Sequence, residues 1–304
     1  MSAQLTIVIP CYNEELAITK VIEEYRCEFP EAKIVVVDNA STDLTATKAA
    51  DAGATVLSEK RQGKARAMLK AFQDVHSDLI LMVDGDGSYP AEGARLLLEE
   101  YGRFPVDMIT GVRSSDGKDE IFRPLHQRGT RCFASCIQFL FGYKAGDVFS
   151  GMRLFTRRFY KNVPILSRGF ELEIELTIQT IDKSFDSSEL IIPFRKREIG
   201  SNSKLKTISD GLRILRNLVL LFRDYKPLTF FGFFATFFFT FGLLSGAPPI
   251  YEYYLTHQVG RFPLAILAAA LMNLSALTLL IGLMSETSLR YHREAFQIKL
   301  RNSV

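Results

Sequence analysis

Two aspartates, Asp84 and Asp86, follow a run of apolar residues in the segment LILMVDGDGSYP, residues 79–90. Their carboxylates lie on one tight turn, and the glycine between them lets the turn bend and a ligand approach. Carboxylate oxygens suit Mg²⁺ or Mn²⁺, which take one or two protein carboxylates and further oxygens from substrate phosphates. The pair therefore predicts a metal site at Asp84 and Asp86, where the cation stabilises charge on a leaving diphosphate.

Three alternatives explain the two aspartates differently. In a calcium-binding EF-hand loop that begins at Asp84, Tyr89 would replace the required glycine and Arg95 the bidentate glutamate, so that loop is not expected. Phosphatases with an aspartyl nucleophile carry a similar sequence after their first strand, whereas here it follows the fourth apolar segment. A solvated turn at the end of a strand is the third alternative, and it implies no chemistry.

Short apolar segments alternate with amphipathic ones through the first half of the chain. The apolar segments predict strands, and the amphipathic ones predict helices between them. The strands are expected over 5–10, 33–38, 54–59, 79–84 and 107–112, and the helices over 14–27, 42–52, 63–76 and 91–103. Nearly continuous apolar strands are typical of an α/β fold with a mostly parallel sheet and helices on both faces.

Polar residues follow three of the predicted strands. The segment 11–14 follows the first strand, Asp38 ends the second, and Asp84 and Asp86 come at the end of the fourth. Open α/β sheets bind ligands at the carboxyl ends of their strands, so we expect the binding site at this edge. No G-x-G-x-x-G follows the first strand, and a nicotinamide or flavin site is therefore not expected.

Two uncharged apolar segments, 228–247 and 262–284, lie near the C-terminus. Each reaches the roughly 20 residues that cross a bilayer, and neither keeps the polar face of a soluble helix. Lysine and arginine flank the pair on its outer sides, whereas the connector carries Arg261 as its fixed positive charge. The positive-inside rule predicts an integral membrane protein with the catalytic domain and both termini in the cytosol.

The expected organisation is a cytosolic domain over 1–206, a juxtamembrane amphipathic helix over 207–227, and a transmembrane hairpin with a basic tail over 228–304. The segments 124–141 and 207–226 mix arginines with apolar residues, and both are predicted to lie in the membrane interface. Amphipathic helices packed on the sheet are the alternative. A two-helix anchor also leaves room for a homo-oligomer.

Composition excludes several classes of protein. A net charge of +3 in 304 residues does not provide the basic face of a nucleic-acid-binding protein. The N-terminus lacks the basic start and long apolar core of a signal peptide, so the chain is expected to begin in the cytosol. No CxxC pair occurs, and four unpaired thiols are typical of a reducing compartment. The cysteines are Cys11, Cys27, Cys132 and Cys136.

Several motifs occur along the chain in one order: VIPCYNEE (8–15), VVVDNASTDLT (35–45), KRQGKARAM (60–68), VDGDGSYP (83–90), GVR (111–113), DVFSGMRLF (147–155) and GSNSK (200–204). Together they resemble glycosyltransferase family 2 with the GT-A fold over about residues 5–225. Within that family the chain is similar to the polyprenyl-phosphate glycosyltransferases, such as dolichol-phosphate mannose synthase. The C-terminal hairpin also suits this subgroup.

The resemblance implies a metal-dependent, inverting transfer of a sugar from a nucleotide-diphospho-sugar to undecaprenyl or dolichyl phosphate. The nucleotide is expected to be UDP, with GDP as the alternative. It implies that Pro10, Tyr12 and Glu14 line the base and ribose, and that Asp38 accepts a hydrogen bond from the base. Asp84 would face the ribose and metal, and Asp86 would bind the metal. Arg113, Arg131 and Lys204 would lie near phosphates, and Asp147 near the reacting sugar or acceptor phosphate; the catalytic residues would be Asp86, Asp147 and Arg131.

Some residues depart from the family pattern or have a structural alternative. Asn39 and Ser88 stand where some relatives carry Asp and Gln. Asp38 or Ser41 could cap the following helix. Further alternatives are a solvated helix face for Glu171, Glu173 and Glu175, and lipid headgroups or substrate as the partners of Arg195, Lys196 and Arg197.

Three other functions are left open. Processive polysaccharide synthases share the two aspartates, but they usually carry a Q-x-x-R-W motif and this chain has no tryptophan. A family 2 transferase could act on another lipid or glycan acceptor. A non-catalytic membrane scaffold is the alternative outside enzymes, although it would have no need for both Asp84 and Asp86.

Overall fold

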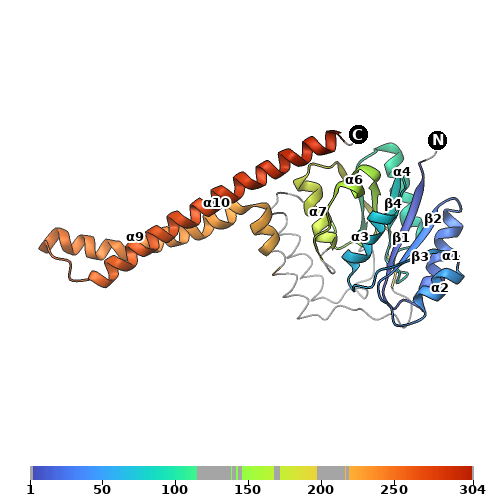
Figure 1. Cartoon of the computed structure of the whole chain (residues 1–304), viewed down its shortest axis with the longest axis horizontal. Coiled ribbons are helices and arrows are strands. Elements are labelled where there is room, and N and C mark those ends of the chain that lie inside the picture. Colours follow the sequence, from blue (N-terminus) through green and yellow to red (C-terminus); the bar gives the residue numbers. More distant parts are fainter. Residues whose placement is uncertain are drawn as a thin grey trace. The chain divides into compact units, whose positions relative to one another are not determined.

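The computed structural model describes residues 3–114, 138, 142, 146–167, 172–196, 216 and 219–302. The chain divides into two compact units, Met1–Leu205 and Lys206–Val304, and each has its own fold (Figure 1). The predicted interfacial helix over 124–141 lies outside the described residues, apart from Gln138. Of the segment 207–226, the described residues are Arg216 and 219–226.

The first unit is built on a seven-stranded sheet with the order β3-β2-β1-β4-β6-β5-β7. Neighbouring strands are parallel except around β6, which lies antiparallel between β4 and β5. The predicted mostly parallel sheet is therefore confirmed, while β6 and β7 were not predicted. The strands are β1 (Leu5–Cys11), β2 (Lys33–Asp38), β3 (Thr55–Ser58), β4 (Leu79–Met82), β5 (Met108–Arg113), β6 (Arg153–Thr156) and β7 (Ser187–Ile192).

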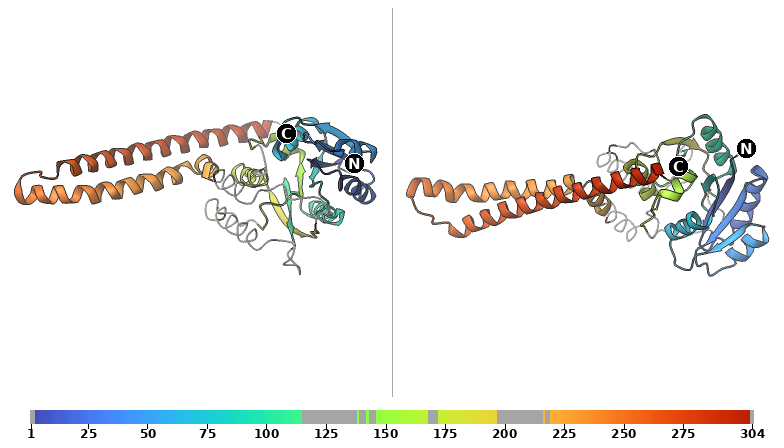
Figure 2. Two further views of the ribbon diagram at one scale, coloured as in Figure 1. Left: turned by 90° about the horizontal axis from the view of Figure 1, so that it is seen from below. Right: turned by 45° about the horizontal axis from the view of Figure 1, so that its top comes forward.

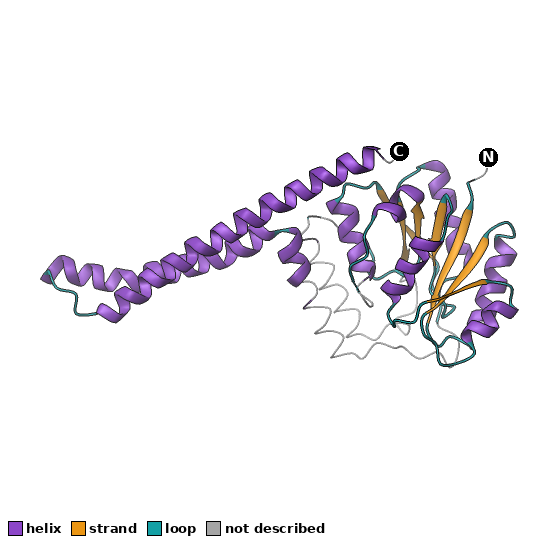
Figure 3. Cartoon of the chain, in the orientation of Figure 1, coloured by secondary structure: helices purple, strands orange, loops and turns teal. Residues whose placement is uncertain are grey.

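Helices cover both faces of this sheet (Figure 3). Ile7 and Ile9 of β1 pack in one core with α1 and α4, whereas Val8, which points to the opposite face, is also fully buried. Burial on both faces explains why the central strands are nearly continuous apolar runs. The helices are α1 (Ile18–Glu28), α2 (Thr45–Asp51), α3 (Lys64–Asp74), α4 (Ala91–Arg103), α6 (Arg157–Asn162) and α7 (Leu172–Asp182).

The strand order reverses at β1, because β2 lies on one side of β1 and β4 on the other. Ligands of open α/β sheets bind outside the carboxyl ends of the strands at such a switch point. Cys11 pairs with Asp38 across β1 and β2, and Val83, just after β4, donates its N–H to the Val8 carbonyl at 3.0 Å. The segments after β1, β2 and β4 therefore leave the sheet at one edge, as the sequence predicted.

The second unit contains two long helices, α9 (Pro227–Thr256) and α10 (Phe262–Asn302), which pack along each other as a hairpin (Figure 2). Both are long and apolar enough to cross a membrane, judged by length and composition. Small residues line their contact: a Cβ on Gly242 would lie 3.0 Å from Met272 Sδ, and Ser275 Oγ donates to the Ala235 carbonyl at 2.8 Å. Large apolar side chains stay exposed, among them Phe233, Leu244, Leu277 and Met284.

Candidate active site

The turn after β4 carries both candidate metal-binding aspartates. Asp84 pairs with Lys64, whose Nζ lies 2.5 Å from Asp84 Oδ1. Asp86 is buried, and its Oδ1 accepts hydrogen bonds from the backbone N–H of Ser88 at 3.0 Å and from Ser88 Oγ at 2.6 Å. Ser88, which departs from the family pattern, thus orients the carboxylate of Asp86.

The glycines of this turn serve two different purposes. A Cβ on Gly85 would lie 2.5 Å from Cys11 Sγ, so the turn packs directly against β1 at the position between the two aspartates. Gly87 has a φ of 74°, a left-handed conformation that glycine adopts without strain. The glycine whose backbone conformation allows the turn to bend is therefore Gly87, which follows the two aspartates. Gly85, between them, is required because a side chain there would clash with Cys11.

Arg195 anchors the same turn from the segment after β7. Its Nε donates to the Gly87 carbonyl at 2.7 Å, and its backbone N–H donates to the Ser88 carbonyl at 3.0 Å. Its guanidinium also forms an ion pair with Glu24 of α1. The side chain thus holds the turn in place. Arg197 lies outside the described residues.

Arg113, the last residue of β5, forms a two-pronged ion pair with Asp147. Arg113 Nε donates to Asp147 Oδ2 at 2.5 Å and Arg113 Nη2 to Asp147 Oδ1 at 2.9 Å. The guanidinium also lies over the ring of Phe194, 5.4 Å from its centroid. Burial disfavours the charged guanidinium, but Tyr89 and Asp147 nearby hold the pKa of Arg113 above its ordinary value. The ion pair thus fixes the guanidinium of Arg113 at the carboxyl end of β5.

The loop 147–152 meets the turn after β4 at Gly151. Its N–H donates to Tyr89 Oη at 2.7 Å. A Cβ on Gly151 would meet Asp84 Oδ2 first and would lie 2.6 Å from Asp84 Cγ. Only glycine allows this loop to lie against the carboxylate of Asp84. Burial raises the pKa of Tyr89 to about 12, so the phenol stays protonated at neutral pH.

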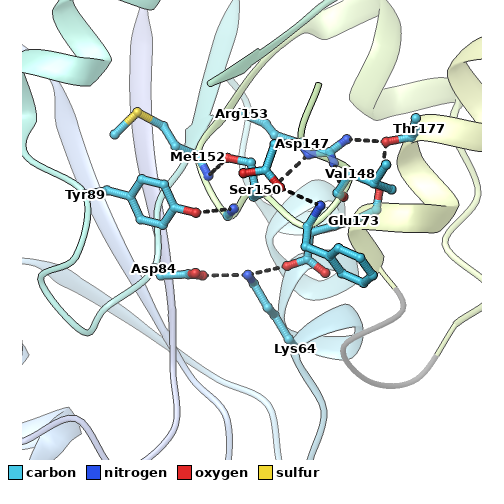
Figure 4. A network of polar contacts seen from close by, with 12 residues as sticks. Lys64, Asp84, Tyr89, Asp147, Val148, Ser150, Met152, Arg153, Glu173 and Thr177 are labelled. Atoms are coloured by element: carbon cyan, nitrogen blue, oxygen red, sulfur yellow. Dashed lines mark hydrogen bonds and ion pairs between the residues drawn. The ribbon is translucent and has the colours of Figure 1, made fainter. Parts of the chain in front are cut away.

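Arg153 of β6 holds this loop from the interior of the protein. It is fully buried, and it donates from Nη2 to the Val148 carbonyl at 2.9 Å and from Nε to the Ser150 carbonyl at 3.2 Å. A third bond runs from Nη1 to Thr177 Oγ1 of α7 at 3.0 Å (Figure 4). Burial lowers the pKa of Arg153. The DVFSGMRLF motif contains this arginine, but the sequence pattern gave it no role.

Lys64 joins the turn to α7. Its Nζ lies 2.5 Å from Asp84 Oδ1 and 2.5 Å from Glu173 Oε1 (Figure 4). Burial disfavours the ammonium form, but the two carboxylates outweigh that effect and raise the pKa of Lys64. The sequence motif GKARA contains Lys64, yet its partner Glu173 is 109 residues away in the chain.

The acidic residues of α7 are not a solvated helix face. Glu173 and Glu175 are both buried. Glu175 accepts hydrogen bonds from the backbone N–H groups of Leu166 at 2.8 Å and Ser167 at 2.9 Å, so it fixes the segment that precedes the helix. The alternative of a solvated face is therefore wrong for both residues, while Glu171 lies outside the described residues.

Backbone contacts fix the segment after β1, which contains Tyr12 and Glu14. The N–H of Asn13 donates to Ser41 Oγ at 3.0 Å, and the N–H of Glu14 donates to Thr45 Oγ1 at 2.8 Å. Pro10, within β1, pairs with Val37 of β2. The predicted nucleotide residues Pro10, Tyr12, Glu14 and Asp38 thus come from the adjoining ends of β1 and β2.

Asp38 and Ser41 do not cap the helix that follows. That helix begins at Thr45, whose N–H donates to Asp43 Oδ1 at 3.0 Å, so the capping alternative is wrong. Asp38 instead lies buried at the end of β2. The adjacent Asn39 donates from Nδ2 to the Arg61 carbonyl at 2.8 Å, so it pins the loop before α3.

The described residues contain no cluster of three or more His, Cys, Asp or Glu side chains placed to bind a metal. Two carboxylates on one turn nevertheless fit a hard divalent cation whose remaining ligands are phosphate oxygens of a bound donor. The structure thus gathers Asp84, Asp86, Arg113 and Asp147 around the ends of β4 and β5. The predicted site residues Arg131 and Lys204 lie outside the described part of the chain.

Residues 6–163 match the family model of Glycosyl transferase family 2. The chain belongs to this family. Glycosyltransferase AglJ of Haloferax volcanii is 30% identical over 289 residues, which cover 95% of this chain and 94% of the relative. The dolichyl-phosphate hexose transferase of the same organism is 29% identical over 71% of this chain and 92% of its own length.

This glycosyltransferase also shares its fold with solved structures. Glucosyl-3-phosphoglycerate synthase from Mycobacterium tuberculosis, crystallised with Mn²⁺, uridine diphosphate and phosphoglyceric acid, superposes with a TM-score of 0.62 at 19% identity. The match covers 73% of this chain and 79% of the synthase. The prediction of a GT-A fold is confirmed.

Proposed function

We propose that this family 2 glycosyltransferase moves a sugar from a UDP-linked donor to a polyprenyl phosphate at a membrane surface. The observation that carries the proposal is that Asp84, Asp86 and the Arg113–Asp147 pair lie at one edge of the sheet, in a chain with two long apolar helices. The dolichyl-phosphate hexose transferase relative and the synthase structure with Mn²⁺ and uridine diphosphate support the choice of acceptor and donor.

The donor is proposed to lie across the carboxyl ends of β1, β2 and β4. Pro10, Tyr12, Glu14 and Asp38 would contact base and ribose from the β1–β2 side. Asp84 would face the ribose and metal region, and Asp86, oriented by Ser88, would bind Mg²⁺ or Mn²⁺. When bound, the cation supplies positive charge for the departing diphosphate.

The acceptor needs little help from a general base. A phosphate monoester has a second pKa of about 6, so it is largely dianionic at neutral pH. Its oxygen forms a bond to the anomeric carbon while the bond from that carbon to the diphosphate oxygen breaks, and UDP leaves with the electron pair. One such displacement inverts the anomeric centre. The protein's task is therefore to position two anions and neutralise their charge.

Arg113 is the cation proposed to meet the phosphate groups. A guanidinium matches phosphate oxygens with two parallel hydrogen bonds, but a flexible arginine loses entropy when it binds. Asp147 holds Arg113 in one orientation before any ligand arrives, and Phe194 supports its face. Asp147 thus has a positioning contact in the structure, in addition to its proposed place near the sugar or acceptor. Arg131 and Lys204 remain proposed phosphate contacts.

The helices α9 and α10 are proposed to anchor the enzyme in the membrane beside its lipid acceptor. Basic residues flank the hairpin at its outer ends, which supports a topology with those ends in the cytosol and the connector outside. We predict that Gln258→Cys in intact cells reacts with a membrane-impermeant maleimide, after the native cysteines are replaced by alanine. A matched Asn302→Cys variant should react after lysis only. The reverse pattern would contradict the topology.

Release of UDP or GDP from a panel of nucleotide sugars tests the proposed reaction. Full-length enzyme in detergent, with Mn²⁺ or Mg²⁺, is assayed with and without polyprenyl phosphate. We expect lipid-dependent release that Asp86→Ala lowers at least a hundredfold, because the leaving diphosphate loses its metal. Asp51→Ala, an exposed carboxylate at the end of α2, is the matched control. Release that ignores the lipid would indicate another acceptor, and no release from any donor would favour the scaffold alternative.

A further inference from the structure

The ammonium of Lys64 has two carboxylate partners that differ in their access to solvent. Both Asp84 Oδ1 and Glu173 Oε1 lie 2.5 Å from Nζ. The side chain of Asp84 is 28% exposed, that of Glu173 is 6% exposed and that of Lys64 is 12% exposed. The Lys64–Glu173 pair is therefore the desolvated one, and Asp84 is the partner that a ligand can reach.

Separating the buried Lys64–Glu173 ion pair is unfavourable in free energy. If Lys64 moved away, the carboxylate of Glu173 would lose its ion pair in a site that water hardly reaches, and an uncompensated buried charge is strongly unfavourable. Asp84 does not face the same constraint, because solvent and ligand cations can replace the ammonium. Lys64 therefore keeps its ion pair with Glu173, whereas its ion pair with Asp84 can be replaced by contacts of Asp84 with solvent or a ligand cation.

We propose that Glu173 is a positioning residue that retains Lys64 when Asp84 turns to the donor and its metal. The inference rests on the proposed function, since it takes Asp84 as part of the donor site. With Glu173 as a permanent counter-ion, Lys64 stays beside the donor's diphosphate without competing for Asp84. Without Glu173, the ammonium has Asp84 as its carboxylate partner and opposes metal binding there.

The proposal predicts a specific change in metal dependence. Glu173→Gln keeps the side-chain volume but removes the charge, so Lys64 pairs more strongly with Asp84. The Mn²⁺ concentration that gives half-maximal UDP binding should rise roughly tenfold or more, while UDP binding at saturating Mn²⁺ is largely retained. Glu173→Asp should restore part of the loss. Binding is measured by calorimetry on the full-length protein in detergent.

Two comparisons separate this effect from simple destabilisation. Glu175→Gln removes another buried carboxylate from the same helix, and it should lower the thermal unfolding temperature without moving the Mn²⁺ midpoint. In a Lys64→Met background, Glu173→Gln should leave the midpoint unchanged, because no ammonium competes for Asp84. Lys64→Met alone should keep a midpoint close to that of the wild type, because Glu173 already prevents Lys64 from competing for Asp84; this result does not require the Glu173→Gln protein to fold.

The outcomes are distinguishable. A wild-type midpoint in Glu173→Gln, or an equal shift with and without Lys64, would overturn the role of Glu173. A midpoint in Lys64→Met well below that of the wild type would also overturn it, since Lys64 would then compete for Asp84 although Glu173 is present. A wild-type chain that binds neither UDP nor GDP with Mn²⁺ or Mg²⁺ would instead overturn the proposed function, and the inference with it.

Discussion

Gly151 is the position where one added methyl group tests the arrangement of the site most sharply. It lies where the loop 147–152 passes the carboxylate of Asp84, and its N–H bonds to Tyr89 Oη. The Gly151→Ala variant adds a Cβ that would lie 2.6 Å from Asp84 Cγ and 2.9 Å from Asp84 Oδ1. The loop has little freedom to retreat, because Arg153 holds the carbonyls of Val148 and Ser150.

The required displacement follows from those distances. Carbon atoms in favourable contact lie about 3.5–4.0 Å apart, so the carboxylate of Asp84 must move by about 1 Å. That movement disturbs the 2.5 Å contact with Lys64 and the position of the Asp84 carboxylate on the turn after β4. A misplacement of about 1 Å in a catalytic arrangement can lower the rate about a hundredfold. We therefore expect kcat/KM for the donor to fall by roughly that factor.

Steady-state kinetics with varied donor, at saturating Mn²⁺ and polyprenyl phosphate, measure this change. Gly102→Ala is the matched control: it lies near the end of α4, a Cβ there meets nothing within 4 Å, and helix propensity predicts a gain in stability of about 0.5–1 kcal/mol. Its activity should equal that of the wild type. A Gly151→Ala enzyme with unchanged kcat/KM would refute the idea that Asp84 must lie against this loop.

Two further predictions concern stability. Hydrogen bonds from Arg61 lower the pKa of Glu59 from 4.5 to about 2, so the pair stabilises the fold above pH 4.5 and loses this contribution as the pH falls toward 2. The unfolding temperature of Glu59→Gln should therefore fall less between pH 4.5 and 2 than that of the wild type. Identical profiles of unfolding temperature against pH would contradict the role of this pair. In the hairpin, Gly242→Leu should lower the unfolding temperature in detergent, because the new side chain pushes α9 away from Met272 of α10. Gly232→Leu should not lower it, because a Cβ there meets nothing within 4 Å. Equal effects of the two substitutions would argue against the packing of the hairpin.

The strands that position the site could be predicted because their signal is local. Each central strand is buried on both faces, so its sequence is an apolar run whatever its neighbours are. The two aspartates after β4 could be placed at the binding edge for the same reason. The strand β6 could not, because it is a four-residue segment whose place between β4 and β5 depends on pairing with strands far away in the chain.

The partners of the charged residues were harder to predict. Lys64 and Arg153 are residue types that usually lie in solvent, and their burial depends on groups from α7 and the loop 147–152. One signal was available: Glu173 and Glu175 are two positions apart, so in a helix they point to nearly opposite sides. The two glutamates therefore cannot share one solvated face.

The contact of Arg195 shows a second limit of sequence patterns. A cluster of basic residues before a membrane anchor is typical of headgroup binding. Arg195 instead bonds the Gly87 carbonyl and pairs with Glu24, which precedes it by 171 residues in the sequence. The sequence left lipid headgroups and substrate open as partners of Arg195, and only the fold shows that this arginine supports the turn after β4.

Direct detection of the product tests the central claim. The full-length enzyme is incubated with Mn²⁺, each of a set of UDP-sugars and a polyprenyl phosphate, and the lipid fraction is analysed by mass spectrometry. We predict a new lipid whose mass equals that of the polyprenyl phosphate plus one sugar residue, formed by the wild type and absent with Asp86→Ala. An unmodified lipid, despite release of UDP from a sugar donor, would contradict a polyprenyl phosphate as the acceptor.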